Sequence, residues 1–90
     1  MVLFPLSTRG GATTAVNTFI VYRRNIPATH NSNQANPPSE PQYEGVIFSD
    51  GTVAIRWLTL KKSTSVWNNF DDMMAVHGHP EYETEVVWLS

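Results

Sequence analysis

The chain of 90 residues contains no cysteine, so no disulfide and no thiolate zinc site can support it. A cysteine-free chain fits a reducing compartment such as the cytoplasm. Its apolar start, residues 1–6, is interrupted by Pro5 and lacks the basic region of a secretory leader. No apolar run approaches the ~20 residues that a membrane helix needs. We therefore expect a soluble cytoplasmic protein.

Signatures of catalysis are missing as well. No serine lies in a nucleophile elbow, and no glycine-rich phosphate loop joins a predicted strand to a helix. Asp71 and Asp72 are adjacent, but neighbouring helix positions point about 100° apart, so the pair suits the first turn of a helix better than acid–base chemistry. We expect neither enzymatic activity nor a cofactor.

Basic residues are few, and all six precede Ser63, after which the charged residues are acidic. Those beyond Arg9 lie near Tyr22 or Trp57 in the sequence, and they are Arg23, Arg24, Arg56, Lys61 and Lys62. Basic side chains among aromatic rings on a small sheet are typical of single-strand nucleic-acid binding. The sequence pI lies below neutrality, which makes this the alternative rather than the main hypothesis.

A β-hairpin is the clearest element. Asp50-Gly51 stands between two apolar runs, which predicts a two-residue type I′ turn with Phe48 opposite Val53. This register places one set of side chains in the core: Val46, Phe48, Val53, Ile55 and Trp57. The opposite face receives Ile47, Ala54 and Arg56.

The remaining pattern predicts strands at 16–23, 64–67 and 84–89 and a helix at about 69–77. Asn68 is the predicted N-cap, and Gly78 the left-handed residue that ends the helix. An apolar stripe at helical spacing should lie on the sheet: Phe70, Met73, Met74 and His77. The fold class is therefore α+β, an antiparallel sheet of four or five strands with one helix on one face.

Two segments lack such patterns. Residues 1–15 are small, polar and rich in glycine, which predicts a flexible N-terminal segment before a single domain at 16–90. Residues 25–42 are rich in proline and asparagine, which predicts a disordered loop, with a partner-binding arm as the alternative.

The stretch His77-Gly78-His79 has the spacing of metal ligands, but a helix end between the two histidines would direct them apart. We therefore expect no metal site, and interpret the histidines as a helix cap or as partner contacts. The complete set of candidate partner-binding residues is Arg23, Arg24, Arg56, Lys61, Lys62, His77 and His79.

Several motifs occur in a distinctive order over residues 44–89: Phe48-Ser-Asp-Gly-Thr, Arg56-Trp57, Ser63-Thr-Ser-Val-Trp67, His77-Gly-His79 and Thr84-Glu-Val-Val-Trp88. In this order they resemble small uncharacterised proteins of bacteriophages and some bacteria. The resemblance implies a source class and no mechanism, so the expected location is the cytoplasm of the host cell.

The functional hypothesis is a non-catalytic interaction or inhibitor protein that binds a host or viral macromolecule. The alternatives are a single-stranded nucleic-acid-binding module and a small-molecule binder at a subunit interface. One helix can cover only one face of the sheet, and apolar side chains are expected on the other, including Ile20, Tyr22, Ile47 and Ala54. We therefore predict a homo-oligomer, most simply a dimer, with a folded-back N-terminal segment as the alternative cover.

Overall fold

The computed structural model describes residues 16–27 and 35–90. The prediction for residues 1–15 and part of that for 25–42 lie outside these ranges. The elements follow in the order β1 (Asn17–Arg23), β2 (Tyr43–Ile47), β3 (Val53–Trp57), β4 (Thr64–Trp67), α1 (Phe70–His77), the 3-10 turn η2 (Pro80–Tyr82) and β5 (Thr84–Trp88).

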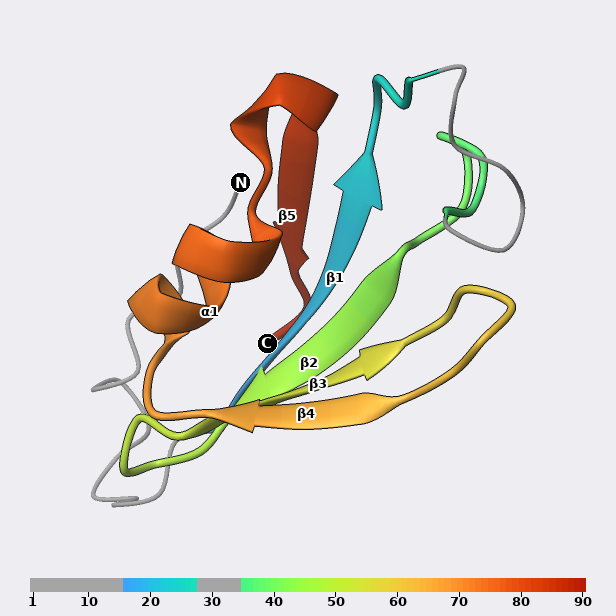
Figure 1. The fold of residues 1–90 in the computed structure, drawn as a ribbon. Helices are drawn as coiled ribbons and strands as arrows, with labels where there is room; N and C mark the ends of the chain where they lie inside the picture. The colour runs from blue at the N-terminus through green and yellow to red at the C-terminus, as the bar shows by residue number, and fades with distance from the viewer. Residues whose placement is uncertain (1–15, 28–34) are drawn as a thin grey trace.

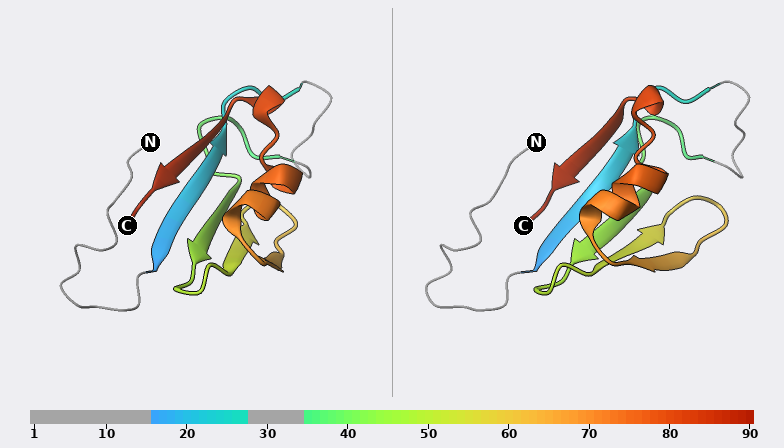
Figure 2. Two further views of the ribbon diagram at one scale, coloured as in Figure 1. Left: turned by 90° about the vertical axis from the view of Figure 1, so that its left-hand side faces the viewer. Right: turned by 60° about the vertical axis from the view of Figure 1, so that its left-hand side comes forward.

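The five strands form one sheet in the order β4-β3-β2-β1-β5, and every neighbouring pair is antiparallel (Figure 1). Helix α1 crosses from β4 at one edge to β5 at the other, and both views of Figure 2 show it on a single face of the sheet. The predicted α+β fold class is thereby confirmed. Within the described residues, no helix is long and apolar enough to cross a membrane.

The core lies between α1 and the sheet. Its fully buried apolar side chains come from three strands and the helix: Phe19, Val21, Tyr43, Val53, Ile55 and Met73. The rings of Phe19 and Phe70 meet edge to face with centroids 5.3 Å apart, and Trp88 packs against both. These aromatic contacts hold helix α1 against strands β1 and β5.

The β2–β3 hairpin has a different register from the predicted one. Ile47 lies opposite Val53, and the Gly51 amide donates to the Phe48 carbonyl at 2.9 Å, so the loop has three residues. Gly51 has φ +93°, as expected for a turn followed by a glycine bulge. The prediction of a two-residue type I′ turn was therefore wrong.

This shift of one residue exchanges the two faces of β2 and leaves β3 unchanged. Ile47 packs towards the core, while Val46 lies on the face away from the helix, opposite Ala54. Phe48 was predicted in the core and is 45% exposed. Val53 and Ile55 are buried as predicted.

The helix ends at His77 as predicted, but its N-cap and the left-handed residue after it each differ from the prediction by one residue. Asn69, not Asn68, is the N-cap, and its side chain accepts a hydrogen bond from the Asp72 amide at 2.7 Å. Gly78 has right-handed helical angles, and the left-handed residue is His79, with φ 42°. Gly78 is still required, because an added Cβ would collide with the Met74 carbonyl oxygen.

Residues 35–42 are anchored to the sheet, in contrast to the disorder predicted for 25–42. The buried Gln42 side chain donates to the Asn36 carbonyl at 2.6 Å and accepts from the Asn36 amide at 2.9 Å. The Asn36 side chain donates to the carbonyls of Pro41 and Leu58. These bonds fix the chain just before β2 begins.

Candidate interaction surface

The face of the sheet opposite α1, here called the open face, carries a row of mainly apolar side chains. Strand pairing aligns one residue from each strand, in the order Val66, Ala54, Val46, Thr18 and Leu89. At the two ends of this row, Val66 is 68% exposed and Leu89 is 53% exposed. Contiguous exposed apolar side chains on one face mark a contact surface.

The next row across the open face adds charge. It runs Thr64, Arg56, Glu44, Ile20 and Val87. Arg56 Nη1 donates to Thr64 Oγ1 at 3.1 Å, and Glu44 lies opposite Arg56 on the neighbouring strand. A positive and a negative group therefore stand side by side next to the apolar row.

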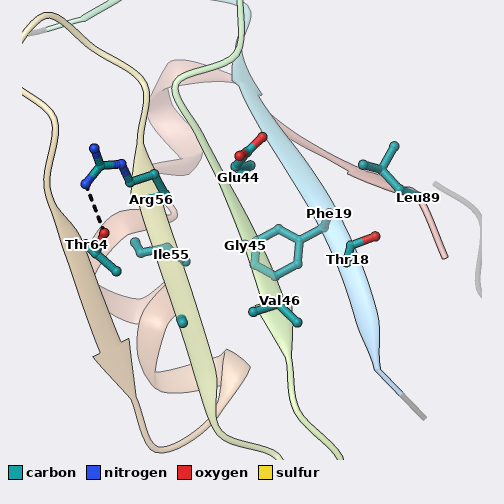
Figure 3. A pocket seen from close by; sticks show the side chains of 10 residues that line it. Thr18, Phe19, Glu44, Gly45, Val46, Ile55, Arg56, Thr64 and Leu89 are labelled. Atoms are coloured by element: carbon teal, nitrogen blue, oxygen red, sulfur yellow. Dashed lines mark hydrogen bonds between the residues drawn. The ribbon is translucent and has the colours of Figure 1, made fainter.

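Between these rows the twisted sheet forms a shallow groove of about 470 Å³. Figure 3 shows this face with α1 behind the sheet and with Arg56, Glu44 and Val46 around the groove. Gly45 lies at the floor of the groove. On the helix side of the sheet, the ring of Phe19 occupies the place where a Gly45 side chain would be. The absence of a Cβ therefore leaves room for the Phe19 ring.

Of the predicted partner-binding residues, Arg56 lines this groove. Arg24 is exposed at the end of β1, with Nε 2.7 Å from Glu85 Oε1 and its guanidinium 4.2 Å from the centroid of the Tyr22 ring. Each of these arginines thus has a carboxylate on a neighbouring strand, Glu44 on β2 for Arg56 and Glu85 on β5 for Arg24. This arrangement resembles a mixed-charge protein contact more than a run of cations for phosphates.

Arg23 lies on the opposite side, in the core below the end of α1, and is only 7% exposed. Its guanidinium lies between the rings of Trp57 and Tyr82, and Nη2 donates to the His77 carbonyl at 3.3 Å. Burial lowers the pKa of Arg23. Tyr43 donates to the same carbonyl at 3.1 Å, and burial raises the pKa of Tyr43 to about 12. Both side chains therefore donate to the His77 carbonyl, one of the carbonyls at the C-terminal end of the helix that have no partner within it.

The two histidines have separate environments. The His77 ring meets Trp57 and Trp67 edge to face, and burial, followed by the charge of Arg23, lowers its pKa. His79 Nδ1 lies 3.0 Å from Glu81 Oε2, a hydrogen bond that lowers the pKa of the Glu81 carboxyl. Among the described residues, no three potential ligands are grouped around a metal position.

The lysines occupy the loop between β3 and β4. Lys62 Nζ donates to the carbonyls of Leu58 and Thr59, both at 3.2 Å, and Lys61 is exposed. The sequence-based set therefore does not form one surface. Arg23 and His77 lie at the end of α1, Lys61 and Lys62 in the β3–β4 loop, Arg24 at the end of β1 and His79 before η2, while Arg56 lines the groove. The set missed Val46 and Glu44, whose spacing on β2 would have placed them together once the correct register was known.

Comparison with known proteins gives one family. Residues 43–90 match the model of a family described as Acb5 phage protein, which covers more than half of the chain. This chain belongs to the Acb5 phage protein family. The predicted resemblance to phage proteins is thus confirmed. Neither the curated proteins nor the solved structures contain a significant match.

The Acb5 match begins at Tyr43, the first residue of β2, and continues to the end of the chain. It therefore includes both charged residues of the open-face groove, Glu44 and Arg56. Strand β1 lies outside the match, although it supplies Phe19 to the core and Arg23 to the end of the helix. The family thus accounts for four of the five strands and for the helix.

Proposed function

We propose that this Acb5-family protein is a non-catalytic interaction protein that acts as a homodimer and binds a protein of the host or of the phage. The observation that carries the proposal is the open face, where the row from Val66 to Leu89 lies on the side of the sheet away from α1. A chain of this size buries only about 60–65% of the surface that its unfolded form exposes, so a second subunit adds needed core.

A second copy of the chain suits the open face because this face carries one positive and one negative residue, so that two such faces can pair opposite charges. Glu44 and Arg56 are neighbours across β2 and β3. Two open faces related by a two-fold axis would bring each Arg56 towards the other subunit's Glu44, while Ala54 and Val46 form the apolar centre. Two sheets packed in this way are about 10 Å apart, the spacing of a β-sandwich.

The dimer is tested by changing Ala54 to lysine, which places a charge at the centre of the apolar row. Light scattering at micromolar concentration should give twice the chain mass for the wild type and the 10.1 kDa of one chain for Ala54→Lys. Leu60→Lys is the matched control, since Leu60 is 64% exposed and lies in the β3–β4 loop. A wild-type mass of one chain would contradict the dimer, and would favour the N-terminal segment or another protein as the cover.

The heterologous partner is tested by affinity capture from infected-cell lysate, followed by reconstitution with the purified candidate. Wild type and Leu60→Lys should form the same complex with it. Recovery of nucleic acid in place of protein, with salt-sensitive gel shifts, would contradict the proposal and support the alternative class.

A further inference from the structure

One of the two edges of the sheet carries a second groove, where strand β4 faces helix α1. Strand β4 comes first in the strand order, so it pairs with β3 on one side and has no described strand on the other. The groove has a volume of about 440 Å³. Its lining residues are Val66, Trp67 and Asn68 from the strand side and Asp72, Ala75 and Val76 from the helix.

The peptide groups of Thr64 and Val66 point to this free edge. In an antiparallel pair, the hydrogen-bonding groups of successive residues alternate between the two sides of the strand. The Trp57 amide donates to the Ser63 carbonyl at 2.9 Å. Residues 63, 65 and 67 therefore face β3, and residues 64 and 66 face outward. An extended peptide can continue the sheet at this position by strand addition.

Strand β4 lacks two of the features by which edge strands prevent such pairing, charged side chains and proline. Edge strands are commonly protected by charged side chains or proline, whereas β4 reads Thr-Ser-Val-Trp. Two valines border the groove with much of their surface in solvent, Val66 at 68% and Val76 at 51%. Val76 and Trp67 lie on the helix side of the sheet, and Val66 lies on the open face. A strand added beside β4 would cover apolar surface on both of its own faces.

The charge at this groove is negative. Asp72 lines it and Asp71 precedes Asp72 on α1, and both residues are exposed. The salt bridges found among the described residues involve other carboxylates, those of Glu85 and Glu81. A lysine or arginine side chain of a bound segment would therefore find an uncommitted carboxylate at the Asn68 end of the groove.

We propose that this groove binds an extended, β-forming segment of the partner protein as a sixth strand beside β4. On the helix side the segment places apolar side chains against Trp67 and Val76, and a lysine or arginine that pairs with Asp72. On the other side of the segment, an apolar side chain contacts Val66. The proposal rests on the proposed function, because it names the chemistry of the protein partner. Its surface is the edge of the sheet at β4 and the side of α1, which meets the open face at Val66.

The test measures fluorescence anisotropy of a labelled nine-residue peptide of valine and threonine that has lysine at two adjacent positions, so that one lysine faces the helix in either orientation of the strand. Wild type and Leu60→Lys should bind it saturably, and Val76→Lys should bind at least tenfold more weakly. Val66→Pro removes the outward amide without removing a bond to β3, and it should weaken binding to a similar extent. Circular dichroism checks that each variant keeps the sheet.

Equal affinity of the peptide for all four proteins would overturn the proposed binding groove. So would binding that does not saturate at millimolar concentration of any of these proteins. The same peptide with glutamate in place of lysine should bind at least tenfold more weakly, and equal binding of the two peptides would overturn the role of Asp72. Light scattering on the same samples separates the two proposals. A monomeric wild type that binds the peptide would overturn the dimer alone.

Discussion

Gly45 has no space for a side chain, because the ring of Phe19 occupies the position that a Cβ would take. A Cβ built at Gly45 would collide with the tip of that ring and approach the Ala54 carbonyl at 2.9 Å. We expect Gly45→Ala to lower the free energy of unfolding by about 1–3 kcal/mol, as overpacking of a core does. Urea denaturation measures the loss.

A double-mutant cycle identifies the cause of that loss. Phe19→Leu shortens the side chain beneath Gly45, so the double variant Phe19→Leu with Gly45→Ala should be more stable than the sum of the single changes predicts. Additive losses would show that the Phe19 ring is not the obstacle.

Gly51 is needed for its backbone and not for space. It has φ +93°, and an added Cβ would meet no atom within 4 Å. Gly51→Ala should therefore cost about 1 kcal/mol of stability through backbone strain alone. Gly51→Asn should cost less in thermal melts, since asparagine tolerates positive φ better. Identical melting temperatures for wild type and Gly51→Ala would contradict this account.

The Asp50-Gly51 pair also shows what the sequence could determine at this scale. It correctly located the hairpin, because only a turn explains a glycine between two apolar runs. It could not determine the register, because both a two-residue turn and a three-residue loop place glycine at positive φ. That one-residue difference decided whether Val46 or Ile47 faced the core.

At the scale of elements, the C-terminal end of α1 is a pH-sensitive junction. His77 is packed between Trp57 and Trp67 near Arg23, and its pKa is lowered from 6.5. The unfolded chain therefore binds a proton at His77 more readily than the folded chain does. Stability from this group is present above about pH 6.5 and is lost as the pH falls through 6.5 towards the lower folded pKa.

We expect the urea concentration at the unfolding midpoint to decrease when the pH is lowered from 7.5 to 5. The decrease should be smaller in His77→Phe, which keeps an aromatic ring between the two tryptophans. Both proteins share the remaining titrating groups, so the difference between them isolates His77. The same change of midpoint in both proteins would exclude His77 as the source.

The helix itself could be predicted from the sequence, but the environment of its end could not. Spacing placed Met73 and His77 on the sheet side, as observed. Arg23 was predicted as a partner-binding residue, whereas the structure buries it. Its burial depends on Trp57, Tyr82 and the His77 carbonyl, which come from three other segments and come together only in the folded chain. Local patterns carry no signal for such a junction.

At the scale of the whole molecule, a homodimer couples folding to concentration. A second subunit binds only the folded chain and so stabilises it as a ligand would. The melting temperature of a dimer therefore rises with protein concentration. A tenfold increase should raise it by about 3–5 °C for two chains of this size. Ala54→Lys should melt at the same temperature at both concentrations. A wild-type melting temperature independent of concentration would contradict a dimer.

The position of β1 between β2 and β5 has a consequence for how the chain folds. Thr18 Oγ1 and Ser90 Oγ lie 2.9 Å apart although 72 residues separate them in sequence. The pairing of β1 with β5 therefore requires closure of a long loop, which slows folding. During synthesis β1 is made first of the five strands and β5 last. One edge of β1 must therefore stay unpaired until the three other strands and the helix have been made and β5 follows.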